Sequence, residues 1–511
     1  MTAWSGGYNA VSDYTFGYVP ELGPQHARLA MLAGGIEPPS SGVRCELGFG
    51  QGLSINLHAA ATGEEWWGTD FNASQAAGAR ALAAASGAAL HLFDQAFDEF
   101  CGRNDLPEFD SIGLHGIWSW VSPANRAIIL DFVRRKLKPG GFVYLSYNTE
   151  PGWALSGPLR HLLREYLRRE YQGGGREADR VSAGLDFIDR ILAVDPGFRR
   201  HNPQVVERLA RMRREDPVYV AHEFLGEHWD TFSFPELERS LADARVEFAV
   251  SADLSDAVEA AYLSPPQQTF LSGIRSVAAR EAARGFMSNR QFRRDYWTRG
   301  RARLSVREVT DRLAASSIVL CTPRADVPRV VRTAVGEVEL DAATFGPMLD
   351  VLSSHEAMLV EALLGRLAHQ GQGLAHVAQA CLLLGYGGHV AFVQPPEAAA
   401  SARESARRFN NHVVERSAWS TELEYLASPV TGGAVRLSNG QLLFLRALRD
   451  GLDAPDAWPD YCLEAWEASG RTFLLEGRPE RRGDSTREVL ARQAAWFAAA
   501  RLPALRALDV V

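Results

Sequence analysis

The sequence has few of the features that mark secreted or metal-binding proteins. Only five of its 511 residues are cysteines, and they lie far apart, mostly within apolar runs: Cys45, Cys101, Cys321, Cys381 and Cys462. This spacing suits neither a disulfide framework nor a zinc site, and it indicates small buried thiols in a reducing compartment. We therefore expect neither a metal site nor disulfides.

Long apolar runs and dense blocks of one charge are also missing. No stretch of about 18 apolar residues is available to span a membrane, and the first residues lack the basic and then apolar order of a signal peptide. The formal net charge of −8 is spread along the chain. Arginines gather at 199–200 and between 290 and 303, where we expect solvated helix faces or strand edges. These absences predict a cytoplasmic protein that binds neither membranes nor nucleic acid.

The most informative feature that is present is a glycine-rich turn between an expected strand at 43–47 and an expected helix at 53–61. The strand carries Glu46 and Leu47. Three glycines then follow at alternate positions: Gly48, Gly50 and Gly52. Glycines are needed where the backbone turns tightly and a ligand approaches closely, and a strand, glycine turn and helix form the nucleotide-binding corner of a doubly wound sheet. Because an acid precedes the glycines, the turn resembles the first motif of class I S-adenosylmethionine (SAM) methyltransferases.

Further polar groups follow the next two expected strands. The strand at 65–69 ends at Asp70 and Phe71, and the strand at 88–92 is followed by Asp94, Gln95 and Phe97. A carboxylate after the second strand accepts hydrogen bonds from both ribose hydroxyls, so we expect Asp70 to hold the ribose. We expect Asp94 to accept from the adenine amino group and Phe97 to cover the ring.

The expected fourth and fifth strands end in unusual strings of residues. The strand at 109–114 leads into His-Gly-Ile-Trp-Ser-Trp-Val at 115–121, and the strand at 142–147 leads into Tyr-Asn-Thr-Glu-Pro-Gly-Trp at 147–153. Together with Asp70 and Asp94, these groups lie just after the carboxyl ends of strands. Open α/β sheets bind their ligands at that edge. We therefore include His115 among the cofactor-binding residues.

These strings, together with residues 222–225, 289–294 and 426–430, resemble bacterial class I methyltransferases that carry a methyltransferase regulatory domain. The rickettsial protein-lysine methyltransferases are the best-known members, and the resemblance covers nearly the whole chain. It implies SAM as cofactor, a helical dimerisation insert, a middle domain and a C-terminal winged-helix region. Phe49 departs from the family pattern, which has cysteine or alanine between the first two glycines, and we expect its bulk to narrow the loop.

The predicted fold is therefore α/β: a doubly wound, seven-stranded, Rossmann-like domain with a helical insert and winged-helix-like α+β domains. The expected divisions are a SAM-binding domain with an N-terminal lid, a helical insert, a regulatory segment that completes the sheet, and two winged-helix-like domains: 1–154, 155–216, 217–300, 301–398 and 399–511. The insert has apolar residues at helical spacing. Since one domain edge cannot hide such a stripe, we expect a homodimer.

Methyl transfer from a sulfonium needs an in-line nucleophile and a dry pocket more than it needs an acid or a base. Aromatic side chains near the strand ends and in the leader are candidates for its walls, because their faces attract cations: Tyr14, Tyr18, Trp118, Trp120, Tyr147 and Trp153. Aromatic residues at strand ends also serve simply as core packing. His115 is a candidate catalytic base for a hydroxyl or amide acceptor, and the alternative is a hydrogen-bonded structural histidine.

Three functions fit these residues. The first is SAM-dependent N-methylation of lysine side chains in a protein, and the second is N- or O-methylation of a small molecule or peptide. The third is a non-catalytic SAM-binding regulator, against which the acidic net charge and the lack of a basic recognition helix argue. Motifs do not separate the first two. An acidic patch near the pocket favours a lysine substrate, whereas an enclosed apolar cavity favours a small molecule.

Overall fold

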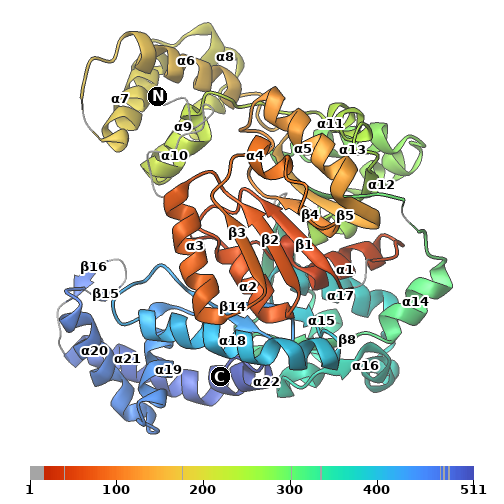
Figure 1. Cartoon of the computed structure of the whole chain (residues 1–511), viewed down its shortest axis with the longest axis vertical. Coiled ribbons are helices and arrows are strands. Elements are labelled where there is room, and N and C mark those ends of the chain that lie inside the picture. The colour runs from red at the N-terminus through yellow and green to blue at the C-terminus, as the bar shows by residue number, and fades with distance from the viewer. Residues whose placement is uncertain are drawn as a thin grey trace.

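The computed structural model describes residues 16–38, 41–174, 176–300, 302–333, 336–471, 473–475, 478–480 and 484–511. At its centre is a seven-stranded sheet with the strand order β3-β2-β1-β4-β5-β7-β6 (Figure 1). The five strands from β3 to β5 are parallel, and β7 is antiparallel to both of its neighbours. The predicted doubly wound, seven-stranded fold is confirmed.

The strands of this sheet agree closely with those expected. They are β1 (Val43–Leu47), β2 (Glu65–Thr69), β3 (Leu90–Phe93), β4 (Phe109–Leu114), β5 (Leu137–Asn148), β6 (Glu247–Ser251) and β7 (Phe292–Thr298). Smaller sheets pair β8 (Ser317–Leu320) with β11 (Met358–Leu359) and β12 (Val390–Phe392), β9 (Val330–Thr333) with β10 (Gly336–Glu339), β13 (Tyr425–Ser428) with β14 (Gly433–Arg436), and β15 (Phe473–Leu475) with β16 (Arg478–Glu480).

Helices cover both faces of the central sheet. One face packs against α4 (Phe97–Cys101), α5 (Pro123–Lys136) and α11 (Phe234–Ala242), and the other packs against α1 (Pro24–Ala33), α2 (Leu53–Thr62) and α3 (Ala73–Ser86). The regulatory segment also contains α12 (Pro265–Ser272) and α13 (Val277–Met287). The C-terminal half adds α14 (Val306–Ala314), α15 (Ala342–Val351), α16 (Val360–Leu367), α17 (Leu374–Tyr386), α18 (Pro396–Arg416), α19 (Asn439–Arg449), α20 (Trp458–Ala468), α21 (Asp484–Trp496) and α22 (Leu502–Ala507).

The helix α2 is buried along its whole length. All ten of its residues are buried, six of them apolar, and the four polar side chains (Ser54, Asn56, His58 and Thr62) are hydrogen-bonded, as burial requires. The sheet covers one side. The long helix α18 and the β13–β14 hairpin cover the other, so that Leu53 and Leu57 share a core with Phe409 and Leu426 (Figure 1). The C-terminal region thus packs directly on the helix that follows the glycine loop.

The helical insert has a core of its own. It consists of α6 (Ser156–Arg169), α7 (Glu177–Ala193), α8 (Gly197–His201), α9 (Val205–Arg214) and α10 (Pro217–Leu225) and projects from one end of the molecule (Figure 1). The apolar stripe of α6, including Leu159 and Leu163, packs against Leu185 and Ile188 of α7. The argument that this stripe must be hidden by a second copy is therefore wrong.

Two arginines near β7 are also buried, contrary to the expected solvated positions. Arg293 is 6% exposed and pairs with Glu281 and Asp295 at 3.0 Å, and Arg290 is 5% exposed and pairs with Asp256. A buried guanidinium requires paired acids, and these acids come from three segments of the regulatory region. Composition alone does not show such pairing.

The C-terminal half contains short helices around small sheets and the expected glycine-bearing hairpin, here β13–β14. Its assignment to winged-helix domains, with boundaries near 300 and 398, remains a prediction. Among the residues that the structure describes, none of the helices has the length and apolarity needed to cross a membrane.

Candidate active site

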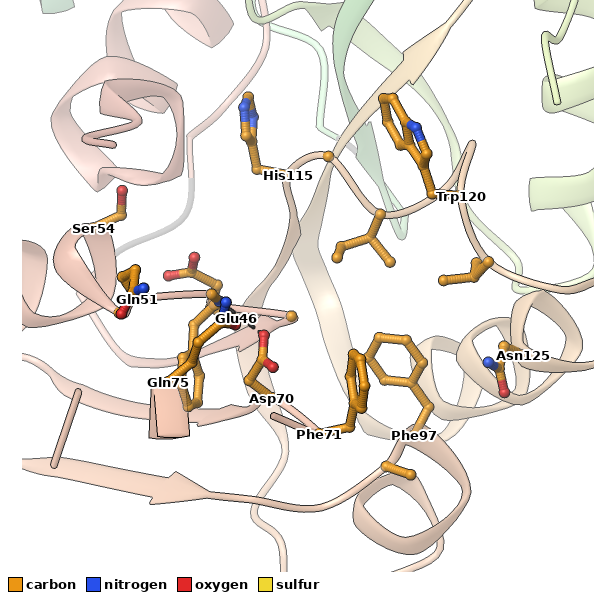
Figure 2. A pocket seen from close by; sticks show the side chains of 18 of the residues that line it. Glu46, Gln51, Ser54, Asp70, Phe71, Gln75, Phe97, His115, Trp120 and Asn125 are labelled. Carbon is orange, nitrogen blue, oxygen red and sulfur yellow. Dashed lines mark hydrogen bonds between the residues drawn. The ribbon is translucent and has the colours of Figure 1, made fainter. Parts of the chain in front are cut away.

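A cavity of about 720 Å³ opens at the carboxyl ends of the parallel strands. Most of the predicted cofactor-binding residues line it: Glu46, Gly48, Gly50, Gly52, Asp70, Phe71, Gln95, Phe97 and His115. Tyr18 of the leader lines it as well. Figure 2 shows His115 and Trp120 on one side of this cavity and Phe71 and Phe97 on the other. The strands thus bring together residues that are far apart in the sequence.

The glycine loop has the backbone conformation that its sequence suggested. Gly48, Gly50 and Gly52 have φ angles of 76°, 57° and 71°, in the left-handed region that favours glycine. A Cβ at Gly48 would lie 2.3 Å from Ile117, and one at Gly52 would lie 2.4 Å from Ala79. The loop therefore requires glycine for both its conformation and its packing.

Asp70 holds the glycine loop in place. Its two carboxylate oxygens accept hydrogen bonds from the backbone N–H of Gly50 at 2.8 Å and of Asn72 at 2.9 Å. Each oxygen retains a lone pair, so that Asp70 can still accept hydrogen bonds from a ribose. Burial raises the pKa of Asp70 to about 6, against the effect of the two N–H groups.

Glu46 lies beside Asp70 in the wall of the cavity (Figure 2). It is 4% exposed, and its Oε2 atom has no hydrogen-bond partner among the residues that the structure describes. Burial raises the pKa of Glu46 to about 8, and the charge of Asp70 adds to this shift. A buried carboxylate without a partner is unfavourable, so the site favours a ligand that brings a positive charge to this point.

His115 follows β4 and lies deep in the cavity wall. Its Nδ1 is 2.8 Å from the hydroxyl of Tyr144 on β5. Burial lowers the pKa of His115 to about 4, although the nearby charge of Glu21 opposes the shift. The imidazole is therefore neutral at physiological pH and is a weak base. It can take a proton from a methyl acceptor only if the protonated form of that acceptor is acidic.

Acidic side chains supply the charge of the cavity lining. The carboxyl groups of Glu46, Asp70 and Asp98 line the cavity, and the described residues of its lining include neither lysine nor arginine. Asp98 and Ala124 are exposed, so this end of the cavity is open to solvent. Among the described residues, no cluster of three or more histidine, cysteine or acidic side chains is arranged to hold a metal ion.

Three of the predicted catalytic aromatics lie outside the cavity, which corrects their expected role. Trp118 is 2% exposed and packs in the core beside Phe232. Tyr147 is fully buried and donates a hydrogen bond to Asp295 at 2.8 Å, because alternation along β5 turns its side chain away from the His115 side. Trp153 begins the core of the insert. Trp120 lines the cavity in their place.

Two predicted cofactor contacts also need correction. Asp94 is outside the cavity lining, because its exposed side chain pairs with Arg80 at 2.6 Å. Leu47 is fully buried in the core beneath the loop.

Phe49 does not close the loop, because its ring packs into the core between α2 and β2 beside Ile55 and Trp66. Tyr14 lies outside the described residues.

Sequence reasoning overlooked several residues of the lining. The first two turns of α2 and α5 supply five of them: Leu53, Ser54, Ala124, Asn125 and Ile128. Helices that follow the strands of such a sheet begin at the ligand-binding edge, and Ser122 before Pro123 marks the start of α5. This start signal was therefore sufficient to identify the first turn of α5 as a candidate.

Comparisons with known proteins agree with this geometry. The family described as "Predicted methyltransferase regulatory domain" matches residues 216–299. PKMT2 from Rickettsia typhi, solved in complex with AdoHcy, has a similar fold with a TM-score of 0.68 and 16% identity over 97% of this chain and 99% of that one. Another structure of the same rickettsial protein gives a TM-score of 0.66 at 15% identity over 96% of this chain and 98% of that one.

The fold, the regulatory domain and the cavity define a class I SAM-dependent methyltransferase with a methyltransferase regulatory domain. Within this class, the chain belongs to the family of the sll1526 protein of Synechocystis sp., which is 32% identical over 512 residues and 99% of both chains. It is also similar to RP028 of Rickettsia prowazekii, at 30% identity over 27% of this chain and 52% of that protein.

Substituting Asp70 should weaken SAM binding. Asp70→Ala removes the acceptors that order the glycine loop and that face the ribose, and each charge-assisted hydrogen bond contributes roughly 1.5–3 kcal/mol. We expect a dissociation constant at least about tenfold higher by calorimetry. Asp94→Ala is the matched control and should stay within about twofold of the wild type. Equal affinities for wild type and Asp70→Ala would contradict this role.

Glu46 should make SAM binding depend on pH. Its raised pKa of about 8 means that the carboxyl group is mostly protonated at pH 6–7 in the empty cavity, whereas a bound ammonium group favours the carboxylate. Binding should therefore release a proton, and affinity should rise nearly tenfold from pH 6 to pH 7. Calorimetry in buffers of different ionisation enthalpy measures the release. Glu46→Gln should abolish it, and an unchanged release in that variant would reject the assignment.

Proposed function

We propose that this methyltransferase transfers methyl groups from SAM to lysine side chains of a protein substrate. The observation that carries the proposal is the charge of the cavity: the described residues that line it include three acidic side chains and neither lysine nor arginine. Such a lining attracts the cationic cofactor and a cationic acceptor, and it disfavours acidic metabolites. The resemblance to the rickettsial protein-lysine methyltransferases supports the same substrate class.

We place the methionine end of SAM at the glycine loop, the ribose at Asp70 and the adenine between Phe71 and Phe97. The acceptor then enters on the side of His115 and Trp120, opposite the adenine (Figure 2). The aromatic face of Trp120 suits an alkylammonium group. This arrangement leaves the sulfonium methyl between the cofactor site and the entering acceptor.

The reaction needs a neutral amine at the end of this path. The lysine ammonium loses its proton to solvent, and desolvation in the cavity favours that loss because it disfavours the charged form. The nitrogen lone pair then attacks the methyl carbon. The C–S bond breaks, and its electrons remain on sulfur as S-adenosylhomocysteine is formed. Positioning of the two reactants supplies most of the rate, so the chain needs no strong base.

Lysine methylation can be tested with SAM that carries a labelled methyl group. We expect label to enter a peptide whose central residue is lysine, and not the same peptide with glutamine or arginine at that position. Mass spectrometry should find the added mass on the lysine. Label in a hydroxyl-bearing metabolite, with lysine peptides and proteins unlabelled, would instead favour O-methylation with neutral His115 as base. His115→Ala would then be the variant to assay.

We also propose a homodimer through the helical insert, following the resemblance. Among its described residues, the insert leaves four large apolar side chains exposed for such a contact: Val194 at 78%, Tyr219 at 49%, Val206 at 44% and Phe198 at 37% exposure. Light scattering at micromolar concentration should give twice the chain mass of 56.1 kDa. Val206→Asp should shift the protein toward the monomer, whereas Val306→Asp on α14 should not. A monomer at all concentrations would exclude the dimer.

A further inference from the structure

One wall of the cavity is a short strap, residues 16–19, that crosses the start of α2. The strap is fixed to that helix by polar contacts. The N–H of Val19 donates to Ser54 Oγ at 2.9 Å, and Ser54 Oγ donates to the carbonyl of Gly17 at 3.2 Å. His58 Nε2 lies 3.0 Å from the carbonyl of Val19. These contacts fix the backbone of the strap, but they do not determine the direction of the Tyr18 side chain. Other groups determine that direction.

The side chain of Tyr18 is held by the β13–β14 hairpin of the C-terminal region. Its ring centroid lies 5.4 Å from that of Tyr425 on β13 and 5.1 Å from that of His58 on α2. Its hydroxyl lies against the backbone of β14, where a Cβ built on Gly433 would be 3.1 Å from it. The hairpin therefore contacts both the ring and the hydroxyl of a residue that lines the cavity.

Further contacts tie the same hairpin to α2 from the outside. Gln394, just before α18, donates to the carbonyl of Ala61 at 2.9 Å, and its own N–H donates to Val430 at the tip of the hairpin at 3.0 Å. Ser405 of α18 donates to the carbonyl of Ala60 at 2.9 Å. The hairpin is thus anchored on the helix that begins at the glycine loop, and its position relative to the cavity is fixed.

We propose that the β13–β14 hairpin is a positioning element of the cofactor site, which acts through Tyr18. The inference rests on the proposed placement of SAM in the cavity. Phe16 and Tyr18 pack against the C-terminal core, so this core orders the strap before the cofactor arrives. Preorganising one wall lowers the entropy cost of binding. Affinity for SAM then depends on residues far from the glycine loop in the sequence.

Gly433 offers a direct test, because a Cβ there would lie 3.1 Å from the Tyr18 hydroxyl. This contact is tighter than most in folded proteins, so Gly433→Ala should shift the Tyr18 hydroxyl by a few tenths of an ångström. We expect the dissociation constant for SAM to rise about five- to tenfold. In the enzyme assay, KM for SAM should rise similarly while kcat at saturating SAM changes less than twofold. Tyr18→Phe removes the crowded oxygen, so in that background Gly433→Ala should change the affinity less than twofold.

Gly440→Ala on α19 is the matched control, because a Cβ there meets no atom within 4 Å. It should leave SAM affinity and the melting temperature unchanged. Tyr425→Ala is a second variant, with a similar expected loss of affinity in a protein that remains folded by circular dichroism. The proposal is overturned if Gly433→Ala and Tyr425→Ala bind SAM as Gly440→Ala does, or if Tyr18→Phe gives no rescue. Wild-type protein that fails to bind SAM would instead reject the cofactor placement itself.

Discussion

The structure depends on the complete burial of α2. This helix begins at the last glycine of the loop and ends at Thr62, and it is covered by the sheet on one side and by the C-terminal region on the other. Because apolar residues occur on more than one side of this helix, they are fully removed from water only when both sides are covered. The methyltransferase sheet and the C-terminal region therefore share a core, and packing against both holds the wall of the cavity in place.

Electrostatics in the cavity work against the empty protein. Glu46 and Asp70 are adjacent and buried, the pKa of each is raised, and one oxygen of Glu46 has no partner in the described part of the chain. Two neighbouring carboxyl groups of this kind cannot both ionise without an opposing charge. A ligand that carries positive charge removes this conflict, so cofactor binding and folding stability are linked. Binding of a positively charged ligand beside these two carboxyl groups is therefore favourable.

Much of this arrangement was predictable from the sequence, because it follows from short-range rules. Strand ends, the glycine conformations and the position of Asp70 result from backbone sterics and strand order. The directions of Trp118 and Trp120 were not predictable, because they lie in an irregular loop whose turns only the packed structure defines. The exposed pair formed by Asp94 and Arg80 likewise depends on where α3 ends against β3. Side-chain direction was the main source of error, in the loop around Trp118 and on the strand β5 at Tyr147.

The order of the strands also has a consequence for synthesis on the ribosome. The interior strand β5 pairs with β4 on one side and with β7 on the other, and β7 comes only after the insert and most of the regulatory segment. Until Phe292–Thr298 has emerged, β5 is an unprotected edge that can pair with another chain. The insert, which has its own core, can fold during this interval. Nascent chains that stall before β7 should therefore be the ones that most need a chaperone.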